Sequence, residues 1–439
     1  MAGIRQTLLQ LAALRRKFQT LLATEGATRG SAASGAFVNN TQNPLTEHKP
    51  GGSNPGELRM YAHVPDVLPK KPALVVALHG CSQDARQFDR GTGWSTLADR
   101  YGFVVVYPEQ QPGNNPKSCF SWFQPGDSTR GRGEAQSIYD MVEYAIATFG
   151  IDRGRVFITG LSAGGAMTSV MLATYPEVFA GGAIIAGLPH GAASSVQEAF
   201  QAMFTDQRFS AESLGDRVRA ASSHRGPWPR ISVWHGTGDR IVRPSNADQI
   251  VAQWSDVHGL PSAHSEQSTN GVHTRRVWND EDGQAVIESI TVADMAHGVP
   301  LASRDTPDAC GAHGPFFLDA GISSTWHIAE LWGLADRAST AATATWTAAT
   351  EALLPKQPAL AAVHRTEARA EKPDRASSEE RTRPGRSWNA DPSSVIARAF
   401  KAAGLPTPEV GRKPEGGGSQ ITPQSIIDAA LKAAGLRQR

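Results

Sequence analysis

The stretch that decides the fold is RVFITGLSAGGAMT, residues 155–168. A short apolar run, typical of a buried strand, leads directly into GLSAG (160–164), and a small-residue helical pattern follows. A G-x-S-x-G pattern between a strand and a helix indicates a tight turn that lifts Ser162 above the edge of a sheet. The helix then points its first N–H groups and its positive dipole end toward the serine. The pattern predicts that Ser162 is a nucleophile.

Short apolar runs recur on both sides of this stretch, and helical patterns lie between them. The strand-like runs are 73–80, 103–109, 155–160, 181–187, 230–236 and 285–298. The clearest helical patterns are 134–150 and 164–176, and 322–334 reads as a closing amphipathic helix. Several runs are apolar almost throughout, as expected for strands buried on both faces. The alternation predicts an α/β fold, with a mostly parallel sheet and helices on both faces.

The composition excludes several classes of protein. The 439 residues carry 43 basic and 42 acidic side chains, for a net charge of +1, which is not the strong positive charge of a nucleic-acid binder. Three cysteines are too few for a disulfide-rich secreted scaffold. The sequence contains no run of 18 or more apolar residues, so no transmembrane helix is expected. It also lacks the spacing of ligand residues that is typical of a metal site. We therefore expect no nucleic acid, no transmembrane segment, no metal and no organic cofactor.

The chain divides into three parts, of which the second is the predicted catalytic domain. Residues 1–30 contain leucines at helical spacing with interleaved Arg and Lys, which predicts a basic amphipathic helix. This helix either docks on the body of the protein or binds a lipid-like or polymer surface. Residues 31–335 form the predicted catalytic domain. Its lead-in, up to residue 56, is rich in Gly, Ser, Thr, Asn and Pro.

The third part, residues 336–439, is predicted to be a mostly disordered tail. The segment 364–387 has almost no apolar residues and cannot bury enough surface to offset the entropy of ordering. Two related segments interrupt it, PSSVIARAFKAAGL (392–405) and PQSIIDAALKAAGL (423–436). Each begins with a serine N-cap signature and ends at a glycine, so we expect two short helices. They either dock on a partner or a hydrophobic surface, or fold back on the catalytic domain.

A serine nucleophile needs a general base within hydrogen-bond reach and an acid that orients the base. In α/β-hydrolases these residues follow the serine in the order acid, then histidine. Asp239 lies in a glycine-containing loop just after the run 230–236, and His297 lies at the end of the last strand-like run, just before Gly298. Asp294, just before the histidine, is the weaker alternative for the acid. The sequence predicts a triad of Ser162, Asp239 and His297.

The same fold forms an oxyanion hole from two main-chain N–H groups. One belongs to Ala163, after the serine, and the other to the loop HGCSQ (79–83), where Cys81 is the expected donor. Cys119 lies in a loop that follows the neighbouring strand, so a Cys81–Cys119 disulfide would hold the oxyanion loop in shape. The alternative is two free thiols, because nothing in the sequence directs the chain to an oxidising compartment. Cys310 is left over.

Six sequence blocks appear in order along the chain. They are LHGCSQD (78–84), SCFSWF (118–123), GLSAGGAMT (160–168), WHGTGDRIV (234–242), AHGVP (296–300) and CGAHGPFFLDAGISSTWHIAELWGL (310–334). Together they resemble the polyhydroxybutyrate depolymerase family of esterases, and in particular the type 1 catalytic domain of short-chain-length polyhydroxyalkanoate depolymerases. That domain is related to feruloyl and acetylxylan esterases. The resemblance covers roughly residues 55–335 and implies an α/β-hydrolase fold, the triad named above and an oxyanion hole at Cys81.

An apolar, insoluble polyester requires an exposed apolar rim around the active site. Trp122 and Phe123 lie in a Gly-, Pro- and Asn-rich loop at the edge where α/β sheets bind ligands, so we predict that they bind substrate. Trp94 and Trp228 are further candidates. The equal alternative is that these aromatic side chains fill the core.

These features predict a serine esterase that hydrolyses poly(3-hydroxybutyrate) or its oligomers through an acyl-enzyme. The alternatives are a feruloyl or acetylxylan-type carboxylesterase, and a non-catalytic protein on a hydrolase scaffold that binds granules or a partner. The intact triad argues against the last. Because the N-terminal stretch lacks the small-residue cleavage site of a signal peptide, we expect a cytoplasmic enzyme associated with storage granules. Secretion by a non-classical route is the alternative.

Overall fold

The computed structural model describes residues 45–336 except 52, 304, 305 and 307, together with the isolated positions Ala13 and Thr20. These residues belong to one compact unit. Ala13 and Thr20 are helical and exposed, and the rest of the predicted N-terminal helix lies outside the described residues. The predicted tail beyond residue 336, with its two repeated helices, also lies outside them.

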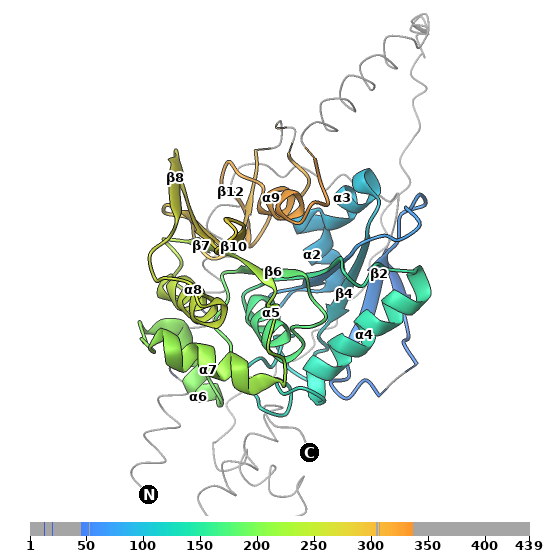
Figure 1. Cartoon of the computed structure of the whole chain (residues 1–439). Helices are drawn as coiled ribbons and strands as arrows, with labels where there is room; N and C mark the ends of the chain where they lie inside the picture. Colours follow the sequence, from blue (N-terminus) through green and yellow to red (C-terminus); the bar gives the residue numbers. More distant parts are fainter. Residues whose placement is uncertain are drawn as a thin grey trace, which may run out of the picture. The chain divides into compact units, whose positions relative to one another are not determined.

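A ten-stranded sheet runs through this unit in the order β1-β2-β4-β3-β5-β6-β7-β10-β9-β8 (Figure 1). The strands are β1 (Thr46–His48), β2 (Arg59–His63), β3 (Leu74–Leu78), β4 (Val104–Glu109), β5 (Val156–Leu161), β6 (Gly181–Ile185), β7 (Arg230–Gly236), β8 (Glu266–Asn270), β9 (His273–Asn279) and β10 (Ala285–Val292). The six neighbours β4, β3, β5, β6, β7 and β10 are parallel. The outer strands pair antiparallel. Two short strands, β11 (Val299–Leu301) and β12 (Phe317–Asp319), pair separately.

The six parallel strands are the six strand-like runs of the sequence, which confirms the predicted α/β fold and its mostly parallel sheet. The outer strands were not predicted, because they lack the apolar run that marks a buried strand. β8 reads EQSTN and every one of its residues is exposed. β1 has only three residues and lies inside the stretch that reads as a lead-in.

Helices cover both faces of the sheet (Figure 1). They are α2 (Ala85–Thr92), α3 (Trp94–Tyr101), α4 (Gly133–Phe149), α5 (Ala163–Thr174), α6 (Val196–Phe204), α7 (Ala211–Ala221), α8 (Ser245–His258) and α9 (Ser324–Leu331). Along β3, Leu74, Val76 and Leu78 pack in the hydrophobic cluster that includes residues of α4, α5 and α8. Val75 and Ala77 pack in a second cluster with residues of α2, α3 and α9. Alternate side chains of a strand thus feed the two layers.

The parallel block brings the carboxyl ends of six strands to one edge of the sheet, where α/β proteins bind ligands. The loops after β3, β5, β7 and β10, which carry the predicted catalytic residues, therefore meet at that edge. None of the described helices is long and apolar enough to span a membrane.

Candidate active site

Ser162 lies on the turn between β5 and α5. Its backbone has φ 58° and ψ −117°, a conformation that residues with a side chain rarely adopt. Its N–H donates to the carbonyl of Ile185, at the end of β6, over 2.9 Å. A Cβ at Gly160 would lie 2.4 Å from the Gly164 oxygen, and a Cβ at Gly164 would lie 2.3 Å from the Leu78 oxygen. The two glycines of the motif are therefore required, and the turn is the tight one that the sequence predicts.

Asp239 and His297 follow the neighbouring strands β7 and β10 and contact each other. Nδ1 of His297 lies 2.7 Å from Oδ2 of Asp239. Oδ1 of the same carboxylate accepts the main-chain N–H groups of Ile241 and Val242, each at 2.8 Å. Asp239 is 2% exposed and His297 is 3% exposed. The acid is thus held by its own loop in the orientation that meets the imidazole.

The charge on Asp239 determines which ring nitrogen of His297 carries a proton. Burial alone would raise the pKa of Asp239, but the attraction of His297 and hydrogen bonds from His235 and His297 outweigh it and hold the pKa well below its usual range. Asp239 is therefore a carboxylate at neutral pH, and a carboxylate can only accept hydrogen bonds. The proton between the two residues belongs to Nδ1, which leaves Nε2 of His297 as the basic nitrogen.

The three predicted residues lie along one edge of the sheet. β5 carries Ser162, β7 carries Asp239 and β10 carries His297, and only β6 separates the first strand from the other two. The structure favours Asp239 over Asp294 as the acid. Asp294 is exposed, adopts φ 55°, and donates its main-chain N–H to the Thr237 hydroxyl over 2.8 Å.

The loops expected to form the oxyanion hole lie beside each other. Ala163 is the first residue of α5, so its N–H has no partner inside the helix. The start of α5 packs directly on the end of β3, because a Cβ at Gly164 would also lie 2.5 Å from the carbonyl oxygen of His79. Cys81 follows two residues later in that same loop. The arrangement can therefore present N–H groups from both loops near Ser162.

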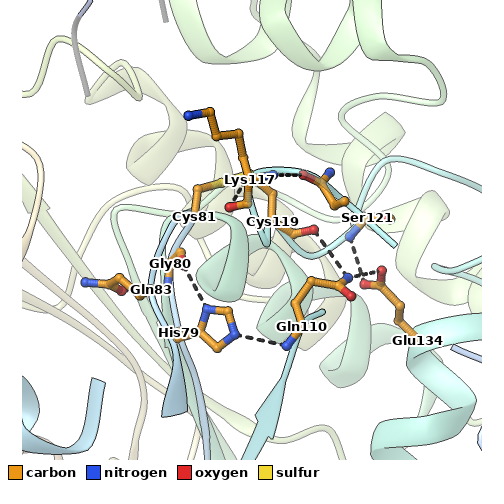
Figure 2. The surroundings of a disulfide bond; sticks show 10 residues. His79, Gly80, Cys81, Gln83, Gln110, Lys117, Cys119, Ser121 and Glu134 are labelled. Atoms are coloured by element: carbon orange, nitrogen blue, oxygen red, sulfur yellow. Dashed lines mark hydrogen bonds between the residues drawn. A yellow bond between two sulfur atoms is a disulfide. The ribbon is translucent and has the colours of Figure 1, made fainter. Parts of the chain in front are cut away.

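A disulfide joins Cys81 to Cys119, with a Cα–Cα separation of 4.3 Å (Figure 2). It is the pairing that the sequence predicts, in place of the alternative of two free thiols. Cys310 is a free thiol whose Sγ lies 3.4 Å from the Ser323 hydroxyl. Burial raises the pKa of Cys310 to about 11, so it stays protonated and is no candidate nucleophile.

The aromatic side chains predicted to bind substrate lie deeper than an exposed rim requires. Trp122 is 6% exposed and belongs to the main hydrophobic cluster. For this residue the prediction of an exposed rim is wrong, and the alternative that its side chain fills the core holds. Phe123 is partly buried against the same cluster and packs edge-on against Trp122 at 5.5 Å between ring centres. Trp94 is 1% exposed. Trp228 is partly buried and packs edge-on near Trp254 at 6.4 Å.

Sequence reasoning missed a group of buried polar side chains behind the oxyanion loop (Figure 2). His79, Gln110 and Glu134 are each at most 2% exposed and are joined by hydrogen bonds. Glu134 lies in the first turn of α4, where an acidic side chain is common because of the helix dipole and does not by itself indicate a buried network. The burial of Glu134, with the nearby charge of Asp127, raises its pKa to about 8. His79 could have been noticed beside Gly80, but no local pattern links residues so far apart in the chain.

A serine on a strained strand–helix turn and an acid–histidine pair at neighbouring strand ends place the protein among the serine hydrolases with an α/β-hydrolase fold. The chain belongs to the family described as esterase PHB depolymerase, whose pattern matches residues 59–286. It is a carboxylic ester hydrolase, as its relatives are.

Two curated proteins and one solved structure are similar to the chain. The chain is 43% identical to poly(3-hydroxyalkanoate) depolymerase C of Paucimonas lemoignei over 291 residues, which cover 66% of this chain and 70% of that protein. It is 38% identical to feruloyl esterase B of Neurospora crassa over 237 residues, 52% of this chain and 80% of that one. The acetyl xylan esterase of Aspergillus awamori superposes with a TM-score of 0.57 at 26% identity, over 66% of this chain and 100% of that structure.

Proposed function

We propose that the protein hydrolyses the ester bonds of poly(3-hydroxybutyrate) or its oligomers, with Ser162 as nucleophile, His297 as base and Asp239 as orienting acid. The observation that carries the chemistry is the 2.7 Å bond from His297 to Asp239, at the edge of the sheet where β5 also places Ser162. The choice of substrate is supported by the 43% identity to a protein named as a poly(3-hydroxyalkanoate) depolymerase.

In the first step Ser162 Oγ attacks the ester carbonyl carbon while Nε2 of His297 takes the hydroxyl proton. The carboxylate of Asp239 stabilises the imidazolium and keeps its Nδ1 proton directed away from the substrate. The N–H groups of Cys81 and Ala163 stabilise the tetrahedral oxyanion. When the intermediate collapses, His297 gives the proton to the leaving alcohol and the acyl group stays on Ser162.

In the second step water replaces the alcohol. Nε2 of His297 takes a proton from the water, whose oxygen attacks the acyl carbon, and the same N–H groups hold the second oxyanion. Collapse returns the proton to Ser162 Oγ and releases a hydroxy acid or a shortened oligomer. Every proton in the cycle passes through His297, so no step needs a metal.

A second candidate substrate class is a feruloyl or acetyl ester of plant polysaccharide. It is favoured by the 38% identity to a feruloyl esterase and by the superposition on an acetyl xylan esterase. The two classes are separated by comparing initial rates on amorphous poly(3-hydroxybutyrate) granules, methyl ferulate and acetylated xylan. The proposal requires release of 3-hydroxybutyrate that Ser162→Ala abolishes. Ferulate or xylan turnover without granule turnover would replace it by the second candidate.

We propose that the enzyme acts in the cytoplasm, at storage granules. A granule-associated enzyme in the cytoplasm fits a storage polymer as substrate. The Cys81–Cys119 disulfide instead favours an oxidising compartment, where such bonds persist, and so supports the alternative of secretion. The redox state of the cysteines in protein isolated from its own cells would separate the two.

A further inference from the structure

The two peptide groups that flank Gly80 are each held by a neighbouring side chain. Nδ1 of His79 lies 2.8 Å from the Gly80 carbonyl oxygen. The Gly80 N–H, on the other side of the residue, donates to Oε1 of Gln83 over 2.8 Å. Gly80 therefore has both its main-chain polar groups fixed by its near neighbours in the sequence (Figure 2).

The hydrogen bonds of His79 determine its tautomer. The main-chain N–H of Gln110 donates to Nε2 of His79 over 3.0 Å, so Nε2 is the nitrogen without a proton. Nδ1 then carries the ring proton and donates it to the Gly80 carbonyl. Burial lowers the pKa of His79 to about 4, which keeps the ring neutral at the pH of an esterase assay.

Holding the Gly80 carbonyl also orients the N–H of Cys81. Among the described residues the cis peptide bond is Gly226–Pro227, so the Gly80–Cys81 peptide is trans. In a planar trans peptide the C=O and the N–H of the same group point in opposite directions. A rotation that turned the Cys81 N–H away would break the bond from His79. Within the described part of the chain, that N–H has no hydrogen-bond acceptor, so it is available to a ligand.

Gln110, whose main-chain N–H holds the His79 ring, is itself held by a side chain of α4. Nε2 of Gln110 donates to Oε1 of Glu134 over 2.5 Å and to the carbonyl of Cys119 over 3.3 Å. Oε2 of Glu134 accepts the main-chain N–H of Ser121 over 2.8 Å. One buried carboxyl group thus ties α4, the side chain of Gln110 and the segment around Cys119 together (Figure 2).

We propose that His79, supported by Gln110 and Glu134, sets the direction of the Cys81 N–H and so keeps the oxyanion hole formed. These three are positioning residues, since none is placed against the reacting atoms. The inference rests on the proposed function, in which the Cys81 N–H stabilises the oxyanion. It adds a noncovalent lock to the disulfide, which joins the side chain of Cys81 but does not itself hold the peptide group, and to the longer 3.3 Å bond that the Gly80 carbonyl accepts from the main-chain N–H of Gln83.

The lock predicts a specific kinetic effect. Both chemical steps pass through an oxyanion, whereas the bound ester has no full charge on its carbonyl oxygen. Losing the N–H should therefore lower kcat and leave KM nearly unchanged. Removing a whole oxyanion donor costs on the order of 100- to 1,000-fold in kcat, and loosening one should cost about 10- to 100-fold.

Two amide variants of His79 separate its donor from its acceptor. In His79→Asn the amide can still reach the place of Nδ1 and donate to Gly80, whereas in His79→Gln it reaches the place of Nε2 and offers no such donor. The lock predicts that kcat on a soluble p-nitrophenyl ester falls about tenfold or more in His79→Gln and less in His79→Asn. If the His79 ring mattered only because it fills space, the order of the two kcat values would be reversed, because Gln is closer in size to His.

Further variants keep the inference falsifiable if a His79 variant folds poorly. Glu134→Gln, which removes one acceptor from the chain, should lower kcat with the same unchanged KM. Combined with His79→Gln it should cost less than the product of the two single effects. The matched control is His258→Gln at the end of α8, where Nε2 also bonds a main-chain carbonyl, that of Pro229 at 3.2 Å. Its kcat should equal that of the wild type.

The outcome is read against Ser162→Ala, which tests the proposed function separately. If Ser162→Ala is inactive while His79→Gln and Glu134→Gln keep the wild-type kcat, the lock is wrong and the triad stands. A rise in KM at constant kcat, or a higher kcat in His79→Gln than in His79→Asn, would also overturn it. Full activity in Ser162→Ala would overturn the proposed function itself.

Discussion

At the scale of single residues, the hydrogen bonds around Asp239 leave little freedom for substitution. Oδ1 is committed to two main-chain N–H donors, and Oδ2 faces both His297 and Nε2 of His235, which lies 3.2 Å away. A side chain at this position must accept on both sides. Only a carboxylate meets that requirement.

We predict that Asp239→Asn lowers kcat by about 10⁴-fold, the loss typical of this change in serine triads. Asn would keep its oxygen toward the main-chain donors and turn its NH₂ group to His297. Nδ1 would then have to accept, so Nε2 would carry the proton and could not act as base. The check is kcat of the purified variant beside its melting temperature. A loss below tenfold in a folded variant would contradict the assigned role.

A second residue-scale prediction concerns pH and His190. Burial, with the nearby charge of Arg217, lowers the pKa of His190 to about 4 from an ordinary value of 6.5. Between pH 6.5 and 4 the unfolded chain therefore binds the proton that the folded chain refuses, and stability falls as pH falls through that window. The stability that depends on a neutral His190 is fully present above pH 6.5.

We expect His190→Asn, which lacks this titration, to lose less stability on acidification than the wild type, by up to about 2 kcal/mol at pH 4.5. His79 acts in the same direction and Glu134 in the opposite one, but both are present in the two proteins and cancel in the comparison. Urea unfolding at pH 7 and pH 4.5 measures the difference. Equal acid losses in the two proteins would contradict it.

At the scale of elements, apolar strands could be predicted from sequence and polar edges could not. A strand buried on both faces, such as β3 with LVVAL, must be apolar throughout and is visible in any window. An edge strand such as β8 forms because β9 offers it unpaired N–H and C=O groups, and that partner is invisible locally. The triad was predictable because each member follows an apolar strand.

The rest of the site depends on contacts between distant segments. Gln110 begins the loop after β4 and Glu134 lies in the first turn of α4, and only the folded chain brings Gln110 to His79 and Glu134 to Gln110. Trp122 also shows that the sequence of a loop does not determine where the loop packs. A Gly-rich loop suggests an exposed ring, but the loop folds back on the core and buries it.

The disulfide is the element-scale feature with the simplest test. It closes a segment with a sequence separation of 38, so removing it should cost about 4 kcal/mol of stability. We predict that Cys119→Ser lowers the melting temperature, and that adding reductant lowers the melting temperature of the wild type but not that of the variant. Thiol titration of the denatured, unreduced wild type should find one thiol, Cys310, of the three cysteines. Three titrating thiols would show that the bond does not form.

At the scale of the whole molecule, the catalytic unit is separable in sequence from the predicted tail helices at 392–405 and 423–436. We predict that deleting residues 388–439 weakens binding to polymer granules while kcat on a soluble ester stays unchanged. The reason is that the two predicted helices, each with an apolar face, have no role in the chemistry described above. Cosedimentation with granules measures the binding. Unchanged cosedimentation would remove the docking role.

The central claim is that Ser162 carries the acyl group of a 3-hydroxybutyrate ester. The most direct test is to mix the enzyme with a 3-hydroxybutyrate oligomer, quench in acid and map the digested peptides by mass spectrometry. We predict that the peptide containing Ser162 gains the mass of a hydroxybutyryl group, and that Asp239→Asn slows its appearance. A modification on another residue, or acylation by methyl ferulate but never by the oligomer, would contradict the claim.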